Sequence, residues 1–302
     1  MNTLSIVIPA LNEAPNLATV MASVPVDALA EAGWQTEILV VDNASTDDTA
    51  EVARSLGARV VSQPARGYGN AYLAGFTAAS GDVIATGDAD CTYPFDALPQ
   101  LLRTLVEQDV EFLTTDRLGR ENREAMKRSH TMANHALSAL SRLLFRNGLR
   151  DSQSGMWIFR RHVWHGLDVR STGMAFSQEI KNAATRAGYR FLEVPIEYRQ
   201  RGGEVKLNAL PDGVANLRQL FEHRFRRSTQ PGAEQPGAEQ PIPEQRGAEQ
   251  RDVARPDAEQ SDPEQPSVEQ SGPEQPGAEQ SGAGRPDQGQ VALPTQRKFE
   301  SV

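Results

Sequence analysis

Short apolar runs rich in β-branched residues alternate with amphipathic segments through the first half of the chain. Runs of this kind are typical of buried strands, and the amphipathic segments have the length and period of helices. The expected strands are 4–8, 37–41, 59–62, 82–86 and 110–114. The expected helices are 15–23, a helix capped by Ser45 or Thr46, 67–79 and 95–107. This alternation predicts an α/β fold, a mostly parallel sheet with helices on both faces.

The second half of the chain has a less regular pattern. It predicts helices at 128–145 and 176–187, short strands at 156–159 and 189–198, and a last helix at 212–227. Pro195 lies inside the expected strand 189–198, and proline cannot donate a ladder hydrogen bond. We therefore expect this strand to lie at an edge of the sheet or to bend.

Polar residues follow the expected strands at the points where the strands end. They are Asn12 and Glu13 after the first strand, Asp42 after the second, Asp88 and Asp90 after the fourth, and Arg117 after the fifth. In open parallel sheets, ligands bind beyond the carboxyl ends of the strands. The sequence therefore predicts one site at this edge.

Asp88 and Asp90 are the strongest candidates for metal ligands. On an extended chain, residues two apart point to the same side, and paired carboxylates suit Mg²⁺ or Mn²⁺. The alternative is a pair of solvated turn aspartates. Gly67 and Gly69 permit either a close backbone approach to a phosphate or a plain tight turn. His162 and His165 have helical spacing, but a surface pair is favoured over a metal site.

The composition changes near residue 229, where a five-residue repeat of the type Pro-Gly-Ala-Glu-Gln begins. Residues 229–302 carry a net charge of −8 and few large apolar side chains, whereas residues 1–228 carry −1. Such a segment cannot bury enough surface to offset its ordering entropy. We predict that residues 1–228 form one folded domain, which would be the catalytic domain. Residues 229–302 are predicted to form a disordered tail.

The compartment is predicted from what the sequence lacks. Cys91 has no second cysteine to pair with, so an internal disulfide is excluded and a reducing compartment fits. No basic region followed by an apolar run begins the chain, so no signal peptide is expected. No apolar window reaches the length of a membrane span, about 18 residues. We expect a cytoplasmic protein, soluble or peripheral on the cytoplasmic membrane face.

Three motifs resemble the signatures of family 2 inverting glycosyltransferases. They are Pro9-Ala-Leu-Asn-Glu13, Val41-Asp-Asn-Ala-Ser-Thr-Asp-Asp-Thr49 and Gly87-Asp-Ala-Asp90. Arg117, Asp151–Gly155, Glu193-Val-Pro-Ile196 and Arg201…Lys206 narrow the resemblance to dolichyl- and polyprenyl-phosphate sugar synthases, of which dolichol-phosphate mannosyltransferases are one kind. The resemblance covers residues 3–210. Gly203-Glu-Val-Lys206 departs from it by lacking a serine, and Thr92 stands where mannosyl enzymes often have glutamine.

The resemblance implies a GT-A, Rossmann-like fold, a UDP- or GDP-sugar donor, Mg²⁺ or Mn²⁺, and a lipid-phosphate acceptor. It also implies residue roles. Asp88, Asp90 and Arg117 would be catalytic, with Asp88 and Asp90 holding the metal. Pro9, Leu11, Glu13, Asp42, Asp88, Ala89, Arg201 and Lys206 would bind the donor, and Arg117, Arg128 and Ser129 the acceptor phosphate.

Two other functions remain open from the residues. A transferase using a soluble hydroxyl acceptor would need a general base, and the second half offers no clear candidate carboxylate. A non-enzymatic nucleotide-sugar binding protein would not need both the carboxylates and the cations. Nucleic acid is not an expected partner, and the sequence makes no prediction of oligomeric state. The last helix combines an apolar stripe with arginines, so it either lies on an anionic membrane or packs on the domain; the stripe is Val214, Leu217, Leu220, Phe221 and Phe225.

Overall fold

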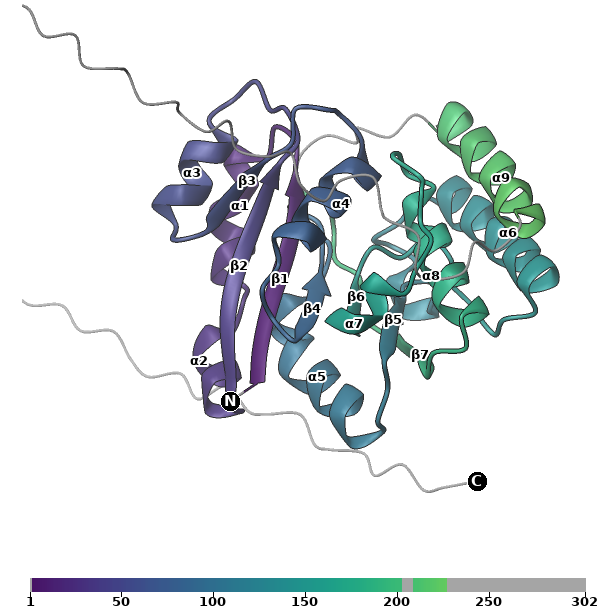
Figure 1. Ribbon diagram of the computed structural model, residues 1–302. Helices are drawn as coiled ribbons and strands as arrows, with labels where there is room; N and C mark the ends of the chain where they lie inside the picture. The colour runs from purple at the N-terminus through teal and green to yellow at the C-terminus, as the bar shows by residue number, and fades with distance from the viewer. Residues whose placement is uncertain (1, 203–208, 227–302) are drawn as a thin grey trace, which may run out of the picture. The chain divides into compact units, whose positions relative to one another are not determined.

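The computed structural model describes residues 2–202 and 209–226, which include a seven-stranded sheet of order β3-β2-β1-β4-β6-β5-β7 (Figure 1). The strands are β1 Asn2–Ala10, β2 Trp34–Asp42, β3 Arg59–Ser62, β4 Val83–Thr86, β5 Phe112–Asp116, β6 Trp157–Arg160 and β7 Phe191–Pro195. Every adjacent pair is parallel except the two that include β6, which runs antiparallel to β4 and β5. The predicted mostly parallel sheet is confirmed.

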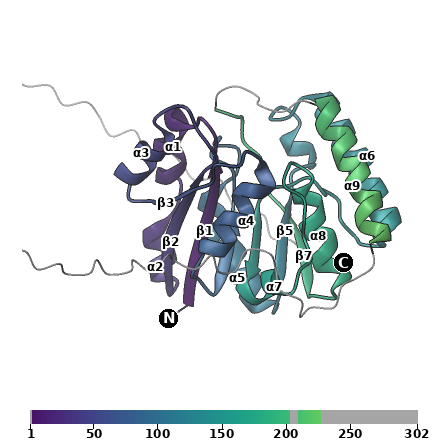
Figure 2. The ribbon, with the colours of Figure 1, turned by 45° about the horizontal axis from the view of Figure 1, so that its top comes forward.

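Helices cover both faces of this sheet (Figures 1 and 2). They are α1 Ala14–Ala22, α2 Val26–Glu31, α3 Thr49–Ser55, α4 Tyr68–Ala78, α5 Leu98–Glu107, α6 Arg128–Phe145, α7 Arg161–His165, α8 Phe176–Arg186 and α9 Ala209–Phe225. The alternating side chains of β1 show why helices must pack on both faces of the sheet. Ile6 and Ile8 belong to the core cluster under α1, α2 and α5, whereas Val7 belongs to the cluster under α4, α7 and α8. Each apolar face of the pleat is thereby buried.

The helix after β2 begins later than its sequence predicts. Ser45 and Thr46 do not cap it; α3 begins at Thr49, with Asp48 in the N-cap position. The Ser45 hydroxyl instead accepts a hydrogen bond from the backbone N–H of Asn12 (3.0 Å), and the Thr46 N–H donates to Asn12 Oδ1 (2.7 Å). These bonds join the two loops that follow β1 and β2. The short helices α2 and α7 were not predicted either.

Pro195 behaves as expected for an edge-strand residue. It ends β7, which is the last strand of the sheet and pairs with β5 alone within the described ranges. The predicted tail 229–302 and the domain boundary at 228 lie outside the described residues. None of the helices in 2–202 and 209–226 has the length and apolarity needed to traverse a bilayer.

His223 of α9 makes folding stability depend on pH. Its ring is buried, 4% exposed, beside Phe145. Burial lowers its pKa from 6.5 to about 4; Arg226 and Arg186 also lower it, while Glu179 and Asp168 oppose the shift. At pH values between these two pKa values, the His223 imidazole is protonated in the unfolded chain and neutral in the folded chain. The free energy of unfolding therefore falls as the pH drops from about 6.5 to 4, by at most about 3 kcal/mol.

Urea unfolding at several pH values measures this dependence. We expect His223→Gln to remove part of the loss between pH 7 and 5, whereas His165→Gln, at an exposed position, keeps the wild-type profile. Identical profiles for the two variants would contradict the assignment to His223.

Candidate active site

The predicted polar residues lie at one edge of the sheet. Ala10, the last residue of β1, pairs with Asp42, the last residue of β2. Strands β4 and β5 run in the same direction as β1, so their ends at Thr86 and Asp116 reach the same edge. Residues following these four strands are therefore brought together, as the positions of the strand ends predicted.

Asp88 and Asp90 are brought together by a turn, and not by the strand alternation that the sequence predicted. Strand β4 ends at Thr86, so strand alternation does not apply to them. They lie in a turn that ends at Cys91, whose φ of 66° is left-handed. Burial and the neighbouring charge of Asp90 raise the pKa of Asp88 to about 7. Two carboxylates thus share one small region, with Ala89 buried between them.

Two tyrosines of α4 hold Asp88. The Tyr68 hydroxyl donates to Asp88 Oδ1 at 3.0 Å, and the Tyr72 hydroxyl lies 3.5 Å from the same atom. A Cβ atom at Gly155 would overlap the Tyr68 hydroxyl, so the tyrosine would have to move away from its present position. Sequence reasoning missed both tyrosines, although their spacing of four residues puts them on one helix face.

Gly67 and Gly69 pack against the protein's own backbone. A Cβ atom on either would overlap the backbone at Ser171 and Thr172, and Gly67 has a φ of 144°. The Asn70 N–H donates to the Thr172 carbonyl at 3.0 Å. Close packing with this loop explains both glycines without a phosphate.

Asp90 is buried, and each of its carboxylate oxygens has a partner. Its Oδ1 accepts hydrogen bonds from the Thr92 hydroxyl (2.6 Å) and the Thr92 N–H (3.1 Å). Its Oδ2 lies 2.7 Å from Arg201 Nη2. The Gly202 N–H also donates to the Asp90 carbonyl at 2.9 Å. The segment around Arg201, distant in sequence, is thus fastened to the carboxylate pair.

Arg117 is held in one orientation by a two-point ion pair. Its Nε and Nη2 donate to Asp151 Oδ2 and Oδ1 at 2.7 and 3.0 Å, and its Nη1 to the Tyr93 hydroxyl at 3.3 Å. The Tyr198 ring lies 5.2 Å from the guanidinium carbon. Burial opposes the charged form of Asp151, yet Arg117 brings its pKa below the usual value. The guanidinium is therefore fixed and 8% exposed.

Two charged side chains clamp the loop that carries Asp151. Lys181 Nζ, fully buried, donates to the carbonyls of Asp151 (3.0 Å) and Ser154 (2.9 Å). The Glu193 carboxylate accepts from the N–H groups of Arg150 (2.7 Å) and Asp151 (2.9 Å). Burial lowers the pKa of Lys181 to about 7 and raises that of Glu193. The Glu193–Ile196 motif thus acts on the loop that orients Arg117.

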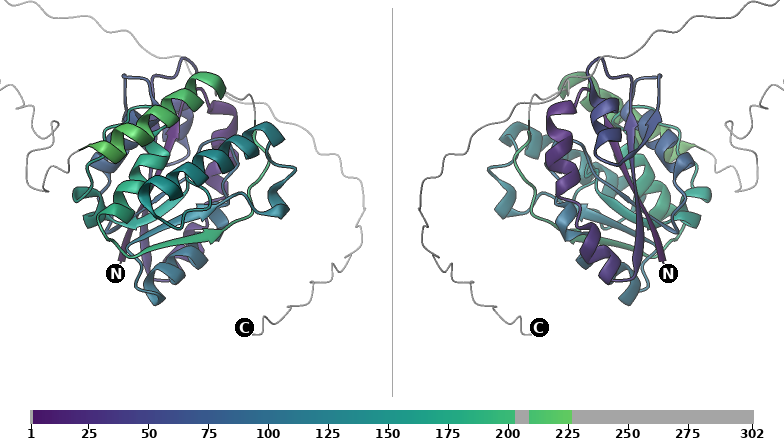
Figure 3. Two further views of the ribbon diagram at one scale, coloured as in Figure 1. Left: turned by 90° about the vertical axis from the view of Figure 1, so that its right-hand side faces the viewer. Right: turned by 90° about the vertical axis from the view of Figure 1, so that its left-hand side faces the viewer.

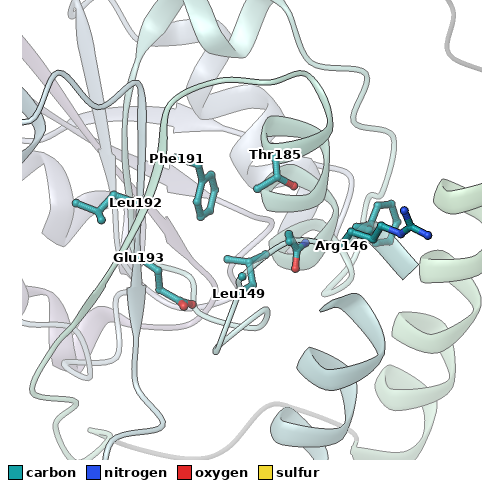
Figure 4. Close-up of a pocket in the computed structure, with 9 residues that line it drawn as sticks. Arg146, Leu149, Thr185, Phe191, Leu192 and Glu193 are labelled. Atoms are coloured by element: carbon teal, nitrogen blue, oxygen red, sulfur yellow. The ribbon is translucent and has the colours of Figure 1, made fainter. Parts of the chain in front are cut away.

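A hollow of about 280 Å³ adjoins this clamp but contains none of the predicted site residues (Figure 4). Glu193 and Phe191 of β7, Thr185 of α8 and Leu149 line it. A second hollow of about 300 Å³ is lined by Asp116 and Leu118, which flank Arg117, and by His135, Arg142 and Arg150. The Arg117 side of the site is therefore bordered by a depression whose lining includes two arginines, one histidine and one aspartate.

The residues expected to bind the donor lie beside the carboxylate pair. Pro9 lies in β1 opposite Val41, and Leu11 follows that strand. Glu13 is buried and accepts from Asn16 Nδ2 at 2.6 Å, while Asp42 Oδ1 accepts from the Ser45 N–H at 3.1 Å. Both carboxylates are therefore held in position by hydrogen bonds.

Other predicted residues are not brought to this centre. Arg128 and Ser129 begin α6 and are exposed; within the described ranges no hydrogen bond or ion pair joins them to Arg117. Lys206 lies outside the described residues. His162 is exposed and contacts Glu111 at 3.2 Å, as expected of a surface histidine.

The carboxylate pair fits a divalent metal ion. In the part of the chain that the structure describes, no three His, Cys, Asp or Glu side chains form a closed metal site. Asp88 and Asp90 would supply two oxygen ligands, leaving positions for diphosphate oxygens and water, as Mg²⁺ and Mn²⁺ prefer. Burial is the main cause of the raised pKa of Asp88; the charge of Asp90 adds to it, and Arg201 opposes it.

Comparison with known proteins agrees with this geometry. The family described as "Glycosyl transferase family 2" matches residues 5–167. The chain therefore belongs to family 2 of the glycosyltransferases, and its mixed sheet is the GT-A, Rossmann-like fold that the motifs implied.

Two relatives come from Haloferax volcanii. A low-salt glycan biosynthesis hexosyltransferase, Agl6, is 38% identical over 72% of this chain, which spans only 52% of that protein. A dolichyl-phosphate hexose transferase is 34% identical over 70% of this chain and 90% of its own length. Among solved structures, glucosyl-3-phosphoglycerate synthase from Mycobacterium tuberculosis, in complex with Mn²⁺, UDP and glucosyl-3-phosphoglycerate, aligns with a TM-score of 0.56 and 26% identity. That alignment covers 74% of this chain and 78% of the synthase.

Proposed function

We propose that this protein is a metal-dependent inverting glycosyltransferase that moves a sugar from a UDP- or GDP-sugar to a polyprenyl or dolichyl phosphate. The observation that carries the proposal is the pairing of two charge centres at one sheet edge. One centre is the carboxylate pair Asp88 and Asp90, which would face the donor, and the other is Arg117, fixed by Asp151, which would face the acceptor. The name of the dolichyl-phosphate hexose transferase among the relatives supports the lipid acceptor.

The donor side would neutralise the leaving group. Asp88 and Asp90 would hold a divalent ion, which would supply Lewis-acid stabilisation of the departing diphosphate. Arg201 adds a guanidinium beside Asp90 that can reach the same phosphates. Glu13 and Asp42 would accept hydrogen bonds from the nucleoside. Tyr68 and Tyr72 keep Asp88 in place, so little reorganisation is needed when charge develops.

The acceptor side would hold a phosphate that is already ionised near neutral pH. One of its oxygens forms the new bond to the anomeric carbon, while the bond to the nucleoside diphosphate breaks and that group leaves with the electron pair. Attack opposite the leaving group inverts the anomeric centre. Because no proton must be removed, the site needs a cation rather than a general base, and Arg117 supplies one. Arg128, Ser129 and Lys206 are proposed as further contacts.

A soluble acceptor is the second candidate. The synthase with a similar fold is described in complex with glucosyl-3-phosphoglycerate, so this fold also serves acceptors without a lipid. A fixed arginine would orient a small phosphorylated acceptor equally well, and the two functions differ in where the product is found. For either acceptor we propose action in the cytoplasm, at the membrane surface when the acceptor is a lipid.

A transfer assay tests the proposal. The full chain is incubated with radiolabelled UDP- and GDP-sugars and polyprenyl phosphate, with Mn²⁺ or with EDTA, and parallel tubes contain 3-phosphoglycerate instead. We expect organic-phase label from one donor with Mn²⁺ and none with EDTA. Label confined to the aqueous product would assign the soluble acceptor. Label in lipid that persists in EDTA would overturn the metal assignment.

A further inference from the structure

Helices α6 and α9 lie side by side (Figures 1 and 3). Most of the side chains that they bury are polar. Among the α9 residues whose burial the structure describes, 213–225, the buried ones are Asn216, Gln219, His223 and Leu220, so only one of these is apolar. In α6 the buried residues are Ser138 and Ser141. A helix on a water-exposed surface normally buries its apolar stripe and presents its polar face to solvent. Helices α6 and α9 instead bury mostly polar residues and expose apolar ones.

Hydrogen bonds fasten this polar face to the domain. Gln178 of α8 donates to the Asn216 carbonyl (2.6 Å) and to Gln219 Oε1 (2.9 Å), and the Ser141 hydroxyl donates to Asn182 Oδ1 (2.7 Å). The Ser138 hydroxyl accepts from the Ser152 N–H at 2.9 Å. These bonds fix the inward face in place, although Asn216 Oδ1, Gln219 Nε2 and His223 Nδ1 are buried there without a hydrogen-bond partner.

The outward face is apolar. Of the nine large hydrophobic residues that are exposed in the described ranges, six belong to α6 and α9. They are Met132 (73% exposed) and Leu143 (75%) of α6, and Val214 (66%), Leu217 (43%), Phe221 (43%) and Phe225 (75%) of α9. The α9 residues recur at spacings of three and four, so they form one stripe. Leu220, predicted as part of it, is buried instead.

The charges that accompany this surface are mainly positive. The sequence of α6 contains no Asp or Glu, and its first residue, Arg128, is exposed. Arg142 of the same helix is half-buried and donates to the Leu149 carbonyl at 2.7 Å, so it does not belong to the outer face. On α9, Arg218 pairs with Glu222 at 2.5 Å, and the Arg224 guanidinium lies 5.9 Å from the Phe225 ring. Apolar side chains interleaved with arginines suit an interface with anionic phospholipid headgroups.

We propose that the outer face of α6 and α9 rests on the surface of an anionic lipid bilayer. Met132, Leu143 and the four exposed α9 residues would enter the headgroup region, with the arginines among the phosphates. The role of this docking rests on the proposed function, because an enzyme that uses a lipid acceptor must reach it at the membrane. Both helices contact the loop of Asp151, α6 through Ser138 and Ser152 and α9 through Asn216 and Gln153, so the docked helices pack on the loop that holds Arg117.

A second copy of the chain fits the outer face of α6 and α9 less well than an anionic bilayer does. A two-fold interface places the same patch against itself, so the arginines of one copy would face those of the other. The outer face offers Glu222 as an acidic partner, and Arg218 already occupies it. A bilayer that carries negative charge satisfies both the apolar and the cationic residues.

Sedimentation of the full chain with vesicles tests this docking. Vesicles of phosphatidylcholine alone are compared with vesicles that also contain phosphatidylglycerol. We expect binding to the anionic vesicles, weakened by salt, and reduced about tenfold or more by Phe221→Ser together with Phe225→Ser. Val106→Ser removes an equally exposed apolar residue from α5 and serves as the control that keeps binding.

Further measurements separate the outcomes. Metal-dependent release of nucleoside diphosphate without a lipid acceptor, and the thermal midpoint, should be unchanged in the double variant, which shows that fold and donor site survive. Equal vesicle binding by wild type and double variant overturns the proposal. A dimer in size-exclusion chromatography that the double variant loses, with no vesicle binding, assigns the face to self-association. If vesicles bind but no sugar reaches lipid, docking stands and the proposed function fails.

Discussion

Replacement of Asp88 or Asp90 by asparagine lowers kcat about a thousandfold or more and leaves the protein folded. The variant keeps the size and much of the hydrogen bonding of each side chain but removes one of two negative charges. If the pair holds a divalent ion that neutralises the leaving diphosphate, several kcal/mol of transition-state stabilisation is lost. Initial rates of label transfer, with increasing Mn²⁺, measure the effect.

The control for this pair is Asp82→Asn. Asp82 immediately precedes β4, is exposed, and accepts a hydrogen bond from the Thr3 hydroxyl at 2.7 Å. Its replacement changes the net charge by the same amount at the opposite end of the strand, and we expect wild-type turnover. Thermal midpoints of all three variants report folding. Turnover by Asp88→Asn or Asp90→Asn at the wild-type rate would refute the assigned role.

Replacement of Asp151 by asparagine is expected to have the largest effect on stability. It leaves the Arg117 guanidinium, 8% exposed, without its carboxylate partner. Breaking a buried ion pair in this way costs about 3–5 kcal/mol, because a buried charge loses its compensation. Asp109→Asn is the matched control, since Asp109 pairs with Arg160 and Arg190 while 73% exposed. We expect that change to cost less than about 1 kcal/mol.

A double variant separates stability from function. Replacing Arg117 by methionine and Asp151 by leucine removes both charges together, so stability should recover in part relative to Asp151→Asn. Transfer activity should not recover, because the acceptor phosphate has lost its fixed cation. Urea unfolding and the transfer assay measure the two properties. Recovery of activity in the double variant would contradict the role of Arg117.

Much of the sheet edge was predictable because it depends on local patterns. Apolar runs locate the strands, and parallel strands must place the residues that follow them, such as Asp42 and Asp88, at one edge. The contact of Arg201 with Asp90 joins residues that no local pattern connects. The same holds for Lys181, which reaches the loop of Asp151 from another helix. Such contacts depend on tertiary packing.

The incorrect predictions arose where a local rule met a competing contact. Ser45 and Thr46 are good capping residues, but Asn12 uses them to join two loops. Strand alternation failed for Asp88 and Asp90 because the chain turns after Thr86. For α9 the sequence shows the apolar stripe but not its direction, which is decided by the polar residues that α8 presents to it.

The polar packing of α6 and α9 has a consequence for the cooperativity of the fold. Net hydrogen bonds contribute about 1 kcal/mol each, and Leu220 is the one buried apolar residue on the described part of α9. The two helices are therefore held less firmly than the sheet core, and their amides are expected to open to hydrogen exchange before those of β1. A membrane bound to their outer face acts as a ligand of the closed state and suppresses this opening. Lipid contact would then tighten the loop behind Arg117 as well as deliver the acceptor.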